Sequence, residues 1–157
     1  MTWYRKAAEQ GLGNAQHMLG LSYQTGVGVP QNYHEAVRWF RRAAAQDYDP
    51  AEALLGMAYD NGTGVLRDVH EAIIWYRKAA EQGNTSAQMS LGLKYASGQG
   101  VPQDYVQAHM WANLATAAGY PDVEKVRDQI ARMMTPQQLE RAQQLAAEWI
   151  PRKRLQQ

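Results

Sequence analysis

The sequence contains no cysteine among its 157 residues. Disulfide bonds, a thiolate nucleophile and a cysteine-ligated zinc site are therefore excluded. The absence does not fix the compartment, because a reduced cytosol and a disulfide-free periplasm both fit. No basic start followed by an apolar stretch indicates a secretory signal peptide. We expect a cytoplasmic protein, or a periplasmic or secreted one if the chain was trimmed from a longer precursor.

The sequence also has little net charge and no long hydrophobic run. A formal net charge of +1 disfavours a nucleic-acid partner or a membrane-surface role, since either needs a concentrated basic field. No apolar run approaches the length of a transmembrane segment. Hydrophobic residues nevertheless make up 45% of the chain, with five Trp and nine Tyr. We therefore expect a folded domain with a well-filled core.

A repeated pattern dominates the sequence. Its central copy carries Ala51, Leu55, Gly56, Tyr59, Gly62, Gly64, Val65, Ala72, Trp75, Ala79 and Ala80. The same residue types recur 36 positions upstream, from Ala15 to Ala44, and most recur 36 positions downstream, from Ala87 to Ala115. A fixed period of this size predicts a solenoid, in which each unit buries its apolar face against its neighbours.

Each copy is predicted to form two antiparallel helices, with no strand anywhere. Ala15, Leu19 and Tyr23 recur every four residues, which places them on one inward face of the first helix. The glycine after each leucine is expected to allow close helix approach rather than to support the helix. Three further glycines are expected to end the first helices, and three short polar residues to cap the second helices: Gly26, Gly62 and Gly98, then Asn32, Asp68 and Asp104.

The expected organisation is one solenoid domain. Its parts are a half repeat at 1–13 containing only a second helix, repeats at 14–49, 50–85 and 86–120, capping helices at 121–150 and a basic tail at 151–157. The first capping helix is expected from Asp122 to Met134, with apolar spacing at Val123, Val126, Ile130 and Met133. Thr135, Pro136 and Gln138 have the pattern of a capped start of the second. Because the segment from Trp3 to Gly11 is identical to that from Trp75 to Gly83, the first helix lacks its partner. Such an open edge would suit a longer array or a homodimer.

These residues resemble the Sel-one-like repeat (SLR) family, relatives of the tetratricopeptide repeats. The resemblance covers Trp3 to Gly119 in three consecutive copies, with mild departures at Leu66, Gln107 and Ala112. It implies an all-α fold, a right-handed superhelix of helix pairs with a C-terminal helical cap. It also implies an adaptor or scaffold for other proteins, often in bacteria.

By similarity to tetratricopeptide repeats, a partner would bind a concave groove lined by the first helix of each unit. The residues opposite the packing face are the candidate groove: Asn14, His17, Leu21, Gln24, Ala53, Met57, Asp60, Met89, Leu93 and Ala96. Leu21, Met57, Met89 and Leu93 would form an apolar floor for an extended peptide or an amphipathic helix. The alternative is that these apolar residues only touch adjacent units.

Other motifs predict structure rather than chemistry. The Gly26-Val27-Gly28 pattern recurs as a helix connector and lacks the strand and the Lys-Ser or Lys-Thr of a phosphate-binding loop. His34 and His70 occupy the same position in different repeats, too far apart to share a metal ion. The arginines and lysine of the second helices are expected on a solvated convex face: Arg38, Arg41, Arg42, Arg77 and Lys78.

Two functions remain open at this point. The favoured one is a non-catalytic interaction scaffold, without cofactor or metal, that binds a protein or peptide in the groove. The alternative is a binder of a small molecule or cell-wall fragment, or a β-lactam-hydrolysing enzyme, because some relatives have been discussed in that role. The chain has no Ser-x-x-Lys motif and no cluster of metal ligands, which disfavours an enzyme.

Overall fold

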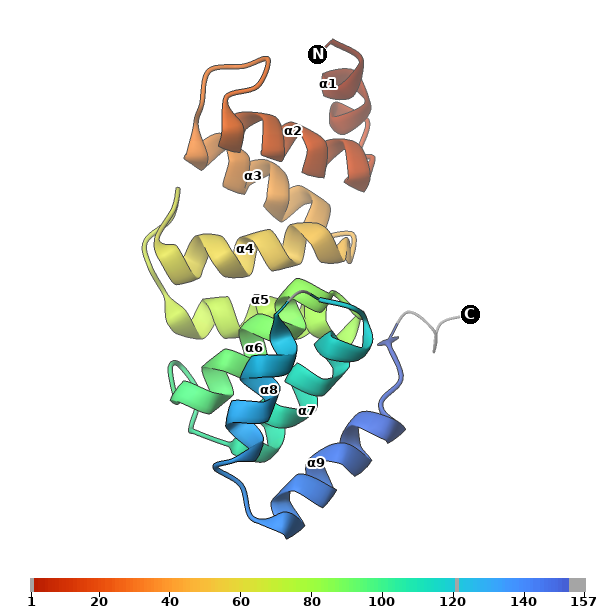
Figure 1. Ribbon diagram of the computed structural model, residues 1–157. Coiled ribbons are helices and arrows are strands. Elements are labelled where there is room, and N and C mark those ends of the chain that lie inside the picture. Colours follow the sequence, from red (N-terminus) through yellow and green to blue (C-terminus); the bar gives the residue numbers. More distant parts are fainter. Residues whose placement is uncertain (1, 121, 153–157) are drawn as a thin grey trace. The chain divides into compact units, whose positions relative to one another are not determined.

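The computed structural model describes residues 2–120 and 122–152, with side chains from residue 5 onwards. In this part of the chain every regular element is an α-helix, as the sequence predicted (Figure 1). The helices are α1 (Thr2–Glu9), α2 (Gly13–Thr25), α3 (Tyr33–Ala44), α4 (Asp49–Asn61), α5 (Val69–Glu81), α6 (Thr85–Ser97), α7 (Tyr105–Ala117), α8 (Val123–Ala131) and α9 (Pro136–Glu148).

The chain divides into two compact units. The first spans residues 1–75 and contains α1 to α4 with the start of α5, and the second spans residues 76–157. Within the first unit α2 packs on α1 and α3, and α3 packs on α4. Within the second unit α7 packs on α6, α8 and α9. The last two helices thus cover α7, in agreement with the expected cap.

The predicted caps and terminating glycines of the repeat helices are confirmed. The side chains of Asn32 and Asp104 accept hydrogen bonds from the backbone N–H groups three residues later, and Asp68 does the same for Glu71. Each bond satisfies an amide that the helix itself leaves without a partner. The three predicted terminating glycines all have a positive φ, between 71° and 77°. Thr135 and Gln138 form the predicted capping box of α9.

The core of each unit contains the inward positions of the repeat. Leu19, Leu55 and Leu91 are buried to within 1% of full burial. In the second unit Ala112, which replaces an aromatic residue of the repeat, packs in a cluster with Val123 and Ile130 of α8. The small side chain of Ala112 therefore leaves space that the apolar side chains of α8 fill.

The predicted solvent exposure of the arginines on the second helices is confirmed, since Arg41, Arg42 and Arg77 are exposed. The guanidinium groups of Arg41 and Arg77 also donate hydrogen bonds to the hydroxyls of Tyr59 and Tyr95, each at 2.7 Å. Arg42 stacks on the ring of Trp39, with its Cζ atom 4.5 Å from the ring centroid. The second helices therefore use their cations to hold neighbouring aromatic residues.

The C-terminal prediction was wrong in one detail. Met133 was expected on the apolar face of the first capping helix, but α8 ends at Ala131 and the Met133 side chain is 63% exposed. The side chain of Trp3, on which the expected dimer edge depends, and the tail from residue 153 lie outside the described residues.

Candidate functional site

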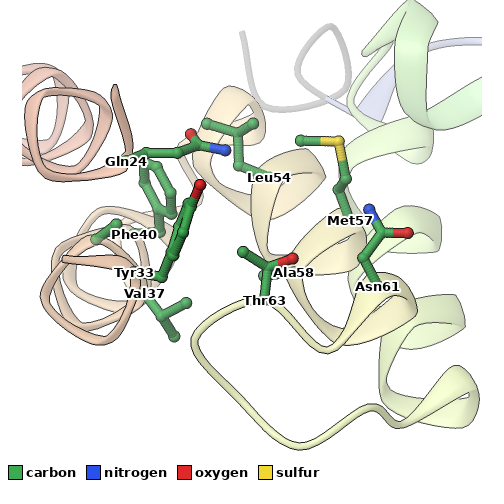
Figure 2. Close-up of a pocket in the computed structure, with 10 residues that line it drawn as sticks. Gln24, Tyr33, Val37, Phe40, Leu54, Met57, Ala58, Asn61 and Thr63 are labelled. Atoms are coloured by element: carbon green, nitrogen blue, oxygen red, sulfur yellow. The ribbon is translucent and has the colours of Figure 1, made fainter. Parts of the chain in front are cut away.

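A pocket lies in the first unit between helices of two consecutive repeats. One wall comes from Gln24 of α2 and from α3, and the other from α4 and the loop after it (Figure 2). It encloses about 360 Å³ of empty space, part of it open to solvent. Ten residues line it: Gln24, Tyr33, Ala36, Val37, Phe40, Leu54, Met57, Ala58, Asn61 and Thr63.

The first wall is held by Gln31, which lies in the loop between α2 and α3. Its Nε2 atom donates to the backbone oxygen of Gln24 at 2.8 Å and to the Tyr33 hydroxyl at 3.0 Å. One side chain thus satisfies a carbonyl at the end of α2 and orients the ring that begins α3. Arg67 and Gln103 donate to the equivalent carbonyls of Asp60 and Ala96. This side-chain hydrogen bond to the end of the first helix therefore recurs in all three repeats.

The second wall includes Thr63, which is positioned by the glycine that follows it. Gly64 has a φ of +74°, and a Cβ atom added there would lie 2.3 Å from the backbone oxygen of Tyr33. The loop after α4 therefore lies directly against the start of α3. Only glycine permits both this conformation and this approach, which gives the second glycine of the repeat a role beyond that of a connector.

The pocket combines an apolar floor with an uncharged polar edge. Phe40 and Val37 are almost fully buried, while Tyr33 is 41% and Met57 38% exposed. The polar groups are the amides of Gln24 and Asn61 and the hydroxyls of Tyr33 and Thr63. None of the lining residues is charged near neutral pH. The arrangement can bind an apolar group and donate or accept hydrogen bonds around it.

The structure separates the candidate groove residues of the first unit. Gln24 and Met57 line the pocket. His17 instead packs against the rings of Phe40 and Tyr48, with centroids 6.0 and 5.3 Å away, and Leu21 packs against the core cluster around Leu55. Burial lowers the pKa of His17, and the nearby Asp49 carboxylate only partly opposes this. Neutral His17 thus serves the packing between repeats.

The other three predicted residues of this unit do not line the pocket. The Asn14 side chain is exposed, and its Oδ1 atom accepts from the backbone N–H of Ala15. Ala53 and Asp60 are half-buried. In the second unit, Met89 and Ala96 pack against the core cluster of α7 and α8, whereas Leu93 is 46% exposed. The exposed apolar groups at predicted groove positions are therefore Met57 and Leu93.

Sequence reasoning missed most of the pocket. The predicted groove was lined by first helices alone, so it omitted Tyr33, Val37 and Phe40 of α3. It also omitted Leu54 and Asn61 of α4, which were not among the candidate groove residues. One signal was available. Ala58 has Lys94 as its equivalent 36 residues later, a departure that marks a place where two repeats differ in space and charge.

Clusters of metal ligands and membrane-spanning helices are both absent from the part of the chain that the structure describes. Across residues 2–120 and 122–152, no group of three or more His, Cys, Asp or Glu side chains could hold a metal ion. Within the same ranges no helix has the length and apolar character needed to cross a membrane.

Comparison with known proteins gives consistent matches. A family model described as the Sel1 repeat matches residues 1–12, 13–48, 49–84 and 85–120. A similar solved structure, 46% identical over 76% of this chain with a TM-score of 0.74, is a protective antigen of uropathogenic Escherichia coli strains that displays an SLR fold. A Sel1 repeat protein from Oxalobacter formigenes is 35% identical over 75% of this chain, with a TM-score of 0.73.

A third similar structure is Helicobacter pylori cysteine rich protein B, which is 25% identical over 80% of this chain and 90% of its own, with a TM-score of 0.62. The present chain covers only 26% of the E. coli protein and 49% of the Oxalobacter protein. No curated protein matches it.

Proposed function

Because this chain belongs to the Sel1 repeat family, we propose that it is a non-catalytic scaffold that binds a protein or peptide partner on the face formed by its first helices. The observation that carries the proposal is the pocket beside Met57, whose lining combines apolar side chains with neutral hydrogen-bonding groups. Such a composition is typical of sites that bind a polypeptide through a few anchoring side chains. In the second unit Leu93, the equivalent of Met57, is the exposed apolar residue at a predicted groove position.

The proposal is tested by capturing partners from the source cell with the immobilised protein. A partner that binds wild-type protein should be lost when Met57 or Leu93 is changed to Asp, with affinity falling at least about tenfold, because each change places a charge in a desolvated contact. Both side chains are partly exposed, so the thermal unfolding midpoint should change little.

Leu66→Asp is the matched control. Leu66 is 91% exposed in the loop between α4 and α5 and is absent from the pocket lining. This variant should keep the partner. Capture that survives both groove variants, or that fails equally in the control, would overturn the proposal.

The alternative of a small-molecule binder or β-lactam hydrolase has less support. A β-lactam carries a carboxylate, and the pocket lining offers no cation to pair with it. A turnover assay with a chromogenic lactam separates the two functions. Hydrolysis that disappears on substitution of a pocket residue would replace the scaffold proposal with an enzymatic one.

A further inference from the structure

The floor of the pocket is suited to one apolar side chain. Phe40, Val37 and Ala58 are between 2% and 8% exposed, and Leu54 and Met57 close the opposite side (Figure 2). The pocket is small and partly open: its empty space of about 360 Å³ includes open solvent, and its cavity volume of about 70 Å³ lies below the range for ligand pockets. It therefore fits a single leucine-sized or phenylalanine-sized group rather than an extended ligand.

The polar groups around this floor have unused hydrogen-bonding capacity. Among the hydrogen bonds of the described residues, none involves the side-chain amides of Gln24 or Asn61. The Tyr33 hydroxyl accepts from Gln31, which leaves its own proton for an outside acceptor. Amide groups present one donor face and one acceptor face, which matches the N–H and C=O of a peptide bond. The edge is thus complementary to peptide backbone beside the anchoring side chain.

The lining also selects against charge. A charged side chain entering the pocket would lose its hydration and meet no opposite charge among the ten lining residues. A neutral backbone with an apolar side chain meets no such penalty. The complementary ligand is therefore an uncharged peptide stretch.

The next repeat does not offer the same lining. At the position equivalent to Ala58, the next repeat has Lys94, a 9% exposed side chain whose Nζ atom lies 3.3 Å from Oε1 of Gln99. Gln99 is the equivalent of Thr63. The small side chains of Ala58 and Thr63 are thus replaced by two long ones, the charged Lys94 and the neutral Gln99.

We propose that the pocket between α3 and α4 is an anchor site for one leucine-like or phenylalanine-like side chain of an uncharged peptide stretch, with Gln24, Asn61 and Tyr33 binding the adjacent backbone. This inference rests on the proposed scaffold function and specifies its ligand. Met57, with its flexible thioether, accommodates side chains of differing shape.

The test uses blocked pentapeptides, acetyl-Ser-Gly-X-Gly-Ser-amide, with Leu, Phe, Ala or Asp at X, titrated into the isotope-labelled full chain and followed by NMR. The Leu and Phe peptides should shift the signals of Gln24 and Asn61 side-chain amides and of the Met57 methyl group. The Ala peptide should bind roughly tenfold or more weakly, because it buries fewer apolar carbons. The Asp peptide should cause no shift.

The double variant Ala58→Lys with Thr63→Gln imports the pair that the next repeat already tolerates, and it should abolish the shifts. Met57→Ser, at a partly exposed position, is the second variant should the first not fold, and it should weaken Leu binding severalfold. Leu93→Ser, at the equivalent position of the next repeat, is the control and should leave peptide binding unchanged.

The outcomes distinguish this inference from the scaffold proposal. No shift with the Leu or Phe peptide at about 10 mM, a concentration that half-saturates even a site with a Kd of about 10 mM, overturns the anchor site. Equal binding of the Asp peptide overturns it as well. If the partner capture described above succeeds and depends on Met57 while the peptides fail, the scaffold survives without the anchor. Localised peptide shifts with no captured partner would leave the anchor and remove the scaffold.

Discussion

Gly20 lies where α2 packs closely against α3. A Cβ atom added there would lie 2.5 Å from Cε1 of Phe40 and 3.2 Å from the backbone oxygen of Ala36. The sequence predicted this close approach from a glycine inside a helix, where glycine costs up to about 1 kcal/mol relative to alanine. Phe40 in turn lines the pocket, so this residue links packing to the proposed site.

Gly20→Ala is expected to lower the free energy of unfolding by about 1 to 3 kcal/mol, because the ring of Phe40 must move. Urea unfolding followed by circular dichroism measures the change. Gly92→Ala is the matched control. A Cβ atom added at Gly92 would have the backbone oxygen of Ala108 as its nearest neighbour, at 3.2 Å, because Ala112 stands at the position equivalent to Phe40. An effect as large at Gly92 as at Gly20 would contradict the role assigned to Phe40.

His109 is a residue whose importance the sequence did not indicate. It is 3% exposed on α7, and Nδ1 has no hydrogen-bond partner in the described part of the chain. Burial lowers its pKa, the Arg127 guanidinium of α8 lowers it further, and the Asp128 carboxylate partly opposes both. The folded state therefore binds a proton at this site less readily than the unfolded state.

The contribution of neutral His109 to the free energy of unfolding should then be complete above the unfolded pKa, about 6.5. It should decrease as the pH falls below that value. One proton taken up only on unfolding costs at most about 1.4 kcal/mol per pH unit. Urea titrations at pH 7.5 and 5.5 should show a smaller decrease for His109→Leu than for wild type. The same substitution at the exposed His34 should leave the decrease unchanged, and an equal decrease in all three proteins would refute the assignment.

At the scale of helices, an arginine and a tyrosine join each second helix to the next first helix. The pairs Arg5 and Tyr23, Arg41 and Tyr59, and Arg77 and Tyr95 all span 18 residues. Sequence analysis assigned the tyrosine to the packing face and the arginine to solvent. It could not foresee the bond, because helical spacing gives the direction of a side chain but not the reach of a guanidinium group towards the neighbouring unit.

Tyr59→Phe is expected to lower the free energy of unfolding by about 0.5 to 1 kcal/mol, since the hydrogen bond is partly exposed. In a double-mutant cycle, Arg41→Ala should cost less in the Tyr59→Phe background than in wild type. Purely additive losses would show that the two residues stabilise the protein independently.

Helix positions and ends were largely readable from the sequence, because each depends on local chemistry. Asn32 and Thr135 form the caps that their short polar side chains predicted, and Gly62 ends α4 in the left-handed conformation that its lack of a Cβ atom allows. Met133 was misplaced for a related reason. Periodicity continued past the point where the chain turns towards the Thr135 cap, so an apolar residue was assigned to a helix that had already ended.

For the molecule as a whole, periodicity predicted the family fold but not the pocket. A period of 36 residues identifies equivalent positions, whereas a pocket arises where equivalent positions differ. Tyr33, Ala58 and Thr63 line it together only because α3, α4 and the following loop meet in three dimensions. His17 and Leu21, which were predicted for the groove, do not line the pocket, because their side chains pack between repeats.

The central claim is that the first helices present the binding face. Methionine methyl NMR of the protein with and without its captured partner tests this directly, because Met57 lines the pocket while Met133 is exposed after α8, away from any first helix. The account predicts that binding shifts the Met57 signal and leaves that of Met133 in place. A partner that shifts Met133 and leaves Met57 unchanged would contradict it.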